Sequence, residues 1–87
     1  MKIVYKYEVG RLVDIPTDHY ILKVGVQRGT VYLWALVNTD SPKVQKDFRL
    51  WGTGQEINKG LKVDHIGTCI DYQSPQKYVW HVFEVFK

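Results

Sequence analysis

The sequence has little of what several classes of protein require. Its single cysteine, Cys69, excludes an intrachain disulfide, so nothing implies an oxidising compartment. Cys69 and three scattered histidines lack the spacing of a metal site, and we expect no metal and no other cofactor. No stretch approaches the roughly 20 apolar residues of a membrane span, and the alternating residues 1–6 are unlike a signal peptide. The sequence therefore predicts a soluble cytoplasmic protein.

Dense clusters of like charge are also missing. Twelve Lys and Arg residues against nine Asp and Glu give a formal net charge of +3, without any run of one sign. This balance tolerates an anionic ligand. A dedicated nucleic-acid binder usually carries a denser basic stripe, so the sequence does not favour a nucleic-acid partner.

Groups of catalytic residues are not evident either. An enzyme needs a nucleophile or an acid–base pair held in a pocket. The acidic residues are spread along the chain, and neither Ser41 nor Ser74 lies in a nucleophile elbow. His81 stands between apolar neighbours, which favours a hydrogen-bonded core or interface histidine over a catalytic base. The sequence predicts a protein that is not an enzyme.

Large apolar side chains, in contrast, are abundant for the length. Eighty-seven residues form one domain, 1–87, with a thin core. Yet 45% of the residues are hydrophobic and 14% are aromatic, more than so small a domain easily buries. The surplus indicates a subunit interface or a ligand pocket. We expect a homo-oligomer.

The apolar residues follow the pattern of β-strands. They alternate, or form short two-sided runs rich in Val, Ile, Tyr, Phe and Trp, and no helical period appears. Arg28-Gly29 predicts a tight hairpin turn in which the glycine supplies the positive φ. The fold predicted is a small all-β antiparallel sandwich or half-open barrel. Its seven expected strands are 1–9, 12–15, 20–27, 30–38, 46–51, 63–72 and 77–86.

Two of the expected strands, 30–38 and 77–86, are apolar on both faces. A two-sided strand lies at the centre of a layered structure, and in so short a chain we expect another subunit to supply the second layer. Trp34 and Trp80 are then core or interface residues. An inward Glu84 requires a partner such as a lysine or His81.

The segment FRLWGTGQEI, residues 48–57, is the strongest candidate for a ligand-facing loop. The strand period of two places Arg49 and Trp51 side by side on one face. An indole can stack on a base, and a guanidinium can pair with a phosphate. The glycines of Gly52-Thr53-Gly54 let the backbone approach a bound group. A plain glycine-rich corner, with Trp51 packed on a neighbouring strand and Arg49 solvated, stays open as the alternative.

Several short segments follow a WALV…GTG…HVFE pattern over nearly the whole chain. They are Leu33-Trp34-Ala35-Leu36-Val37, Phe48-Arg49 to Gly52-Thr53-Gly54, Ile66-Gly67-Thr68, His81-Val82-Phe83-Glu84 and, near the start, Tyr5-Lys6-Tyr7. Together they resemble a family of very small all-β proteins found mostly in phages and prophages. Some small phage β-proteins similar to this family sequester the cyclic nucleotide messengers of bacterial antiphage signalling, such as CBASS, without cleaving them.

The resemblance implies a non-enzymatic nucleotide sponge in the cytoplasm of a bacterial host. Bases would stack on the indole or a tyrosine, basic side chains would meet phosphates, and polar groups of the loop would read base or ribose edges. The alternative class is a phage structural or host-interaction protein that uses its aromatic surface for protein–protein contacts. The ligand-binding residues implied are Arg49, Trp51, Gly52, Thr53, Gly54, Gln55 and Lys59.

Overall fold

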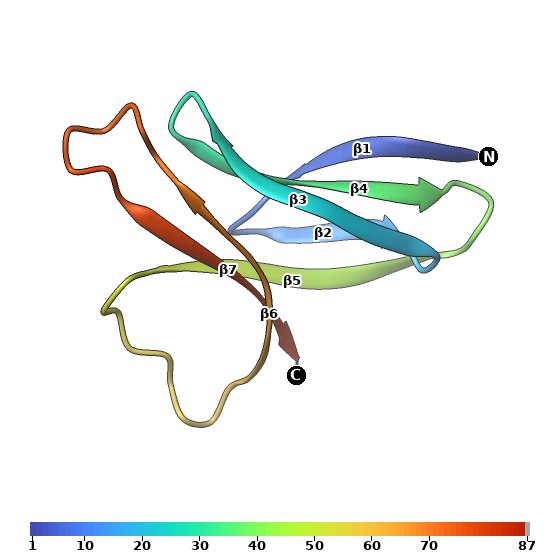
Figure 1. Ribbon diagram of the computed structural model, residues 1–87. Helices are drawn as coiled ribbons and strands as arrows, with labels where there is room; N and C mark the ends of the chain where they lie inside the picture. The colour runs from blue at the N-terminus through green and yellow to red at the C-terminus, as the bar shows by residue number, and fades with distance from the viewer. Residues whose placement is uncertain (87) are drawn as a thin grey trace.

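The computed structural model describes residues 1–86, which form two antiparallel β-sheets and no helix (Figure 1). One sheet has the strand order β1-β4-β3 and the other has the order β2-β5-β7-β6. No helix in this part of the chain could span a membrane. The predicted all-β sandwich is confirmed. The strands are β1 (Lys2–Glu8), β2 (Leu12–Pro16), β3 (His19–Gln27), β4 (Thr30–Asn38), β5 (Lys43–Gly52), β6 (Lys62–Ile70) and β7 (Val79–Phe86).

The predicted strand bounds hold best where the pattern is strongest, and β4 matches its prediction residue for residue. β5 begins at Lys43, three residues before the predicted start at 46, because β2 pairs with its polar first half. β7 begins at Val79 and not at Lys77, whose φ of 51° is incompatible with a strand. These differences arise where pairing or turn geometry overrides the local pattern.

The β3–β4 connection is the tight hairpin that the sequence predicts. Arg28 and Gly29 have φ values of 53° and 78°, as a two-residue type I′ turn requires at both central positions. The glycine occupies its position without strain, whereas Arg28 is one of two non-glycine residues with positive φ among residues 1–86.

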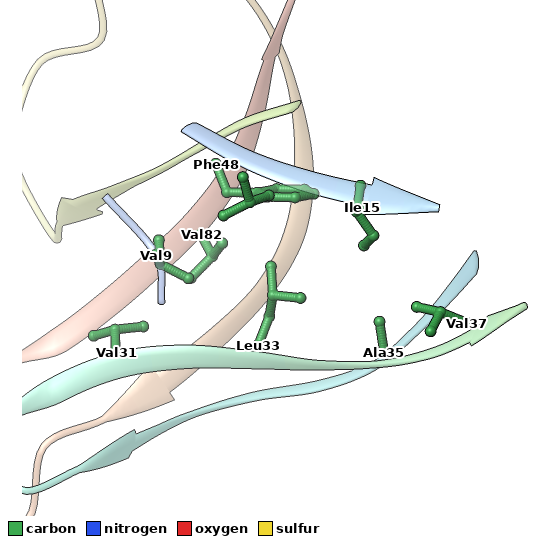
Figure 2. Packing of buried hydrophobic residues seen from close by; sticks show 9 residues of the cluster. Val9, Ile15, Val31, Leu33, Ala35, Val37, Phe48 and Val82 are labelled. Atoms are coloured by element: carbon green, nitrogen blue, oxygen red, sulfur yellow. The ribbon is translucent and has the colours of Figure 1, made fainter. Parts of the chain in front are cut away.

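The core lies between the sheets, as Figure 2 shows. Every second residue of β4 points inward and is buried, while the residues between them are half-buried on the outer face. Phe48 of β5 and Val82 of β7 meet this row from the opposite sheet, and Phe48 is only 1% exposed. Burying such a side chain contributes about 1.5–3 kcal/mol. The buried cluster comprises Val9, Val13, Ile15, Val31, Leu33, Ala35, Val37, Phe48 and Val82.

One layer over β4 is supplied by the same chain, and the expectation that another subunit covers the other face stays a prediction. The inner face of β4 packs on Phe48 and Val82, whereas its outer face, with Tyr32 and Trp34, is only half-buried. Glu84, whose strand partner is the buried Phe48, has its expected partner: the Lys46 ammonium lies 2.8 Å from its carboxylate. The two-sided pattern of β4 therefore reflects one buried face and one partly open face.

Candidate functional site

The outer face of β5 carries the side-chain pair that the sequence singled out. Phe48 is buried against the core, so Asp47, Arg49 and Trp51 share the opposite face, as the strand period predicts. Trp51 is half-buried, and its ring meets Phe83 of β7 edge-on, with centroids 5.7 Å apart. The indole therefore packs on a neighbouring strand without being sealed in the core.

Arg49 is held by its neighbour on the same face. Its Nε donates to both carboxylate oxygens of Asp47, and its Nη2 donates to Asp47 Oδ2 at 2.7 Å. The hydrogen bond and the charge of Asp47 raise the pKa of the Arg49 guanidinium. One edge of the Arg49 guanidinium is thus occupied by Asp47 and its charge is compensated. Fewer N–H donors and less net charge therefore remain to bind a phosphate.

The loop after β5 is closed by Gln55. The Gln55 amide donates to the Gly52 carbonyl at 3.1 Å, and the Gly52 amide donates to the Gln55 side-chain oxygen. Gly54 has a φ of 88°, a conformation that favours glycine. The side-chain oxygen of Gln55 therefore closes the loop, while its side-chain NH₂ group can still donate hydrogen bonds.

A hollow of about 460 Å³ lies between this loop and the segment that enters β7. We call it the glycine-loop hollow. Its lining has one lysine, no carboxylate and two aromatic rings, those of Tyr78 and Trp80, with centroids 5.8 Å apart. Tyr78 is 50% exposed, so its ring is open to solvent. The lining residues are Gly52, Thr53, Gln55, Gln76, Lys77, Tyr78, Val79 and Trp80.

Three of the sequence-predicted residues, Gly52, Thr53 and Gln55, line the glycine-loop hollow. Arg49 and Trp51 do not, because the strand period turns their side chains to the outer face of the β2-β5-β7-β6 sheet. The loop therefore divides the predicted set between two surfaces that meet at Thr53.

The remaining two predicted residues lie elsewhere. Gly54 faces open space, with no atom within 4 Å of where a Cβ would stand. Lys59 lines a different hollow, together with Glu56, Ile57 and Asn58. Gly54 is not among the residues that line the Lys59 hollow, although only four residues separate the two along the chain.

Sequence reasoning missed the contribution of the β6–β7 turn, which supplies Gln76, Lys77 and Tyr78 to the hollow. The sequence marks a turn there, but not its position beside the glycine loop. The register of β5 with β7, in which Gly52 faces Trp80, brings the two segments together. A Cβ at Gly52 would lie 3.3 Å from Gln55 Oε1 and 3.5 Å from Trp80 Cζ3, so the tighter contact is with the Gln55 side chain that closes the loop.

A chain of hydroxyl and imidazole groups extends from the hollow across the outer face. His81 Nε2 lies 2.9 Å from Thr53 Oγ1, and His81 Nδ1 lies 3.0 Å from Thr68 Oγ1. His65 Nε2 lies 3.0 Å from the same Thr68 hydroxyl. A neutral imidazole has one donor and one acceptor nitrogen, so the chain can run in either direction. His81 is hydrogen-bonded, as predicted, but it lies on the outer face and not in the core.

The other candidate residues do not form a site of their own. Among residues 1–86 no group of three or more His, Cys, Asp or Glu side chains could hold a metal ion. Burial, and to a smaller extent the charge of Asp71, raise the pKa of the Cys69 thiol, which lowers its reactivity. The glycine-loop hollow and the adjoining outer face hold five of the seven sequence-predicted residues and are therefore the candidate site.

Fold and site together define a small antiparallel β-sandwich with an acid-free hollow at one end. The chain belongs to the family described as Domain of unknown function (DUF7352), whose model matches residues 1–87. No curated protein matches the chain, and no solved structure does.

Proposed function

We propose that this protein binds a cyclic nucleotide messenger of bacterial antiphage signalling, such as that of CBASS, and sequesters it without cleaving it. The observation that carries the proposal is the lining of the glycine-loop hollow. It combines Lys77 and the open ring of Tyr78 with several hydrogen-bonding groups, and it includes no carboxylate. For an anionic aromatic ligand, a cation attracts the negative charge, an exposed ring provides a stacking surface, and the lack of carboxylates avoids repulsion.

In the proposed complex, a base stacks on Tyr78 next to Trp80, and the Lys77 ammonium meets a phosphate. Thr53, Gln55 and Gln76 offer hydroxyl and amide groups to base or ribose edges. This assignment moves the stacking and charge roles from Trp51 and Arg49 to the β6–β7 turn. A ligand that extends past Thr53 would reach the Trp51 side of the loop.

Self-association belongs to the proposal. The described chain exposes 5999 Å², whereas a compact monomer of 10.2 kDa is expected to expose about 5,300 Å². Exposed large apolar residues include Ile3, Tyr5 and Val4 of β1 and Tyr20 of β3. A homo-oligomer would bury part of this surface and could place equivalent hollows around one two-fold ligand. Light scattering coupled to size exclusion measures the subunit number, and a monomer at all concentrations would contradict this part.

Isothermal titration with a panel of cyclic dinucleotides and cyclic ADP-ribose isomers tests the binding. Lys77→Asn removes the charge but suits the positive φ of position 77, so the turn is retained. We expect at least one ligand to bind, and Lys77→Asn to weaken it about 10-fold, as loss of a charge-assisted contact does. Tyr78→Leu should weaken it about 5- to 100-fold, the effect of one stacked base.

Lys59→Ala is the matched control, because it removes the same charge from a different hollow. It should leave the affinity unchanged. Ligand recovered from the complex by heat and chromatography should be intact; cleaved ligand would overturn sequestration without turnover. No heat from any member of the panel, with folded protein, would overturn the proposed function.

A further inference from the structure

The outer face of the β1-β4-β3 sheet carries an aromatic pair at its centre. Tyr32 and Trp34 lie two positions apart on β4, with ring centroids separated by 6.3 Å. Gly25 of β3 lies beside the indole, since a Cβ there would lie 3.4 Å from Trp34 Cζ3. Both rings are half-buried, and no second sheet covers this face in the described chain.

Basic side chains flank the pair on both neighbouring strands. The register places Lys6 of β1 and Lys23 of β3 opposite Trp34. Lys6 Nζ lies 4.4 Å from the Tyr32 ring centroid, and Lys23 Nζ lies 5.3 Å from that of Trp34. Neither lysine forms an ion pair within residues 1–86, so neither charge is compensated. One donor of the Lys6 ammonium is taken by Gln27 Oε1 at 2.9 Å, and the others remain for an anion.

A second acid-free hollow, of about 550 Å³, adjoins Tyr32 at the β3–β4 hairpin. Lys6 and the exposed Arg28 supply its positive charge. Glu8, which lies across from Tyr32, is already within 3.6 Å of Arg11. The lining residues are Lys6, Val26, Gln27, Arg28, Thr30, Tyr32 and Gln73.

We infer that this face binds single-stranded nucleic acid. Bases stack on Tyr32 and Trp34 as the Lys6 and Lys23 ammonium groups move from the ring faces to the phosphates, and Arg28 meets a further phosphate. Alternating aromatic rings with cations beside them are the features by which proteins hold single strands without reading sequence. Charge complementarity selects this occupant over a second copy of the chain, which would bring the same lysines to the interface. The basic residues look scattered in the sequence because β1, β3 and the β3–β4 turn carry one each.

Fluorescence anisotropy with labelled 12-nucleotide oligouridine and oligothymidine tests the inference. Each neutralised phosphate of a single strand contributes about −0.7 to the slope of log K against log salt concentration. Three contacts predict a slope of about −2, hence an affinity about 20-fold lower at 200 mM than at 50 mM salt.

Two variants locate the site. Arg28→Asn keeps the positive-φ turn, because asparagine tolerates that conformation, and should reduce the slope by about 0.7. Trp34→Leu should weaken binding about 5- to 100-fold, and Lys23→Gln gives an independent readout if Trp34→Leu does not fold. Lys59→Ala, with the same loss of charge as Arg28→Asn, should weaken binding less than Arg28→Asn.

The inference fails if neither oligonucleotide binds at 50 mM salt, or if Arg28→Asn and Lys59→Ala weaken binding equally. It also fails if Lys77→Asn abolishes binding while Arg28→Asn has no effect, because the strand would then occupy the glycine-loop hollow. A dimer that Trp34→Leu dissociates would assign the face to a second copy. Arg28→Asn should leave cyclic nucleotide binding unchanged, so the two sites are tested separately.

Discussion

Gly67 should be indispensable for packing one edge of the sandwich. A Cβ at this position would lie 2.8 Å from Val24 Cγ2 and 3.4 Å from its Cγ1, where β6 crosses β3. Side-chain atoms are not found that close, so either β6 or Val24 has to move. Val24 is partly buried against the core, which restricts its movement.

The expected cost follows from these distances. Gly67→Ala should destabilise the native state by about 1–3 kcal/mol, the usual effect of overpacking. In a domain of this size each kcal/mol lowers the melting temperature by about 4–8 °C. Val24→Ala removes both offending atoms and leaves the Val24 Cβ 3.6 Å away, an ordinary contact. In that background Gly67→Ala should stabilise by about 0.4–1 kcal/mol, because alanine restricts the unfolded chain.

Urea unfolding of the wild type, both single variants and the double variant measures the coupling between the two sites. Gly60→Ala is the control: the nearest atom to its Cβ would be Asn58 Oδ1 at 3.4 Å, in an exposed turn. It should change stability by about 0.5 kcal/mol or less. If Gly67→Ala costs the same with and without the Val24 methyl groups, the contact with Val24 is not the reason for glycine.

Further predictions concern the surroundings of three residues, Glu84, Cys69 and Gly29. Glu84→Ala should lower the free energy of unfolding in urea by about 1–3 kcal/mol, because it leaves the three-quarters-buried Lys46 side chain without its partner. Glu84→Gln should cost less. If Glu84→Ala is as stable as the wild type, the role of the ion pair is refuted. Native Cys69 should react with iodoacetamide at pH 8 more slowly than in urea, because its raised pKa disfavours the thiolate. For the same reason the free energy of unfolding should fall as pH rises past the ordinary thiol pKa of 9.0, because the unfolded chain loses the thiol proton first. Cys69→Ala should reduce this fall. If the pH profile of Cys69→Ala equals that of the wild type, burial of the thiol is contradicted. Gly29→Ala should lose about 1 kcal/mol at its φ of 78°, measured by thermal unfolding, and no loss would contradict the type I′ turn.

The candidate site shows which features a strand pattern predicts and which it does not. The period of two correctly places Arg49 and Trp51 on one face, because that relation depends on neighbouring residues alone. It could not reveal the Asp47 carboxylate taking one edge of the guanidinium, nor the Gln55 oxygen closing the loop. Side-chain hydrogen bonds depend on conformations that a pattern of residue types does not specify.

The sequence by itself determined the strand class, the approximate strand positions, the turns and the residues that share a face of each strand. Those features depend on alternation and on glycine or proline within a few residues. Only the tertiary structure decided which strands pair and in which register, because pairing joins residues far apart in the chain. That register sets Gly52 beside Trp80 to form the glycine-loop hollow, and it sets Lys6 and Lys23 on either side of Trp34. The two proposed binding surfaces therefore exist only once the sheets have formed.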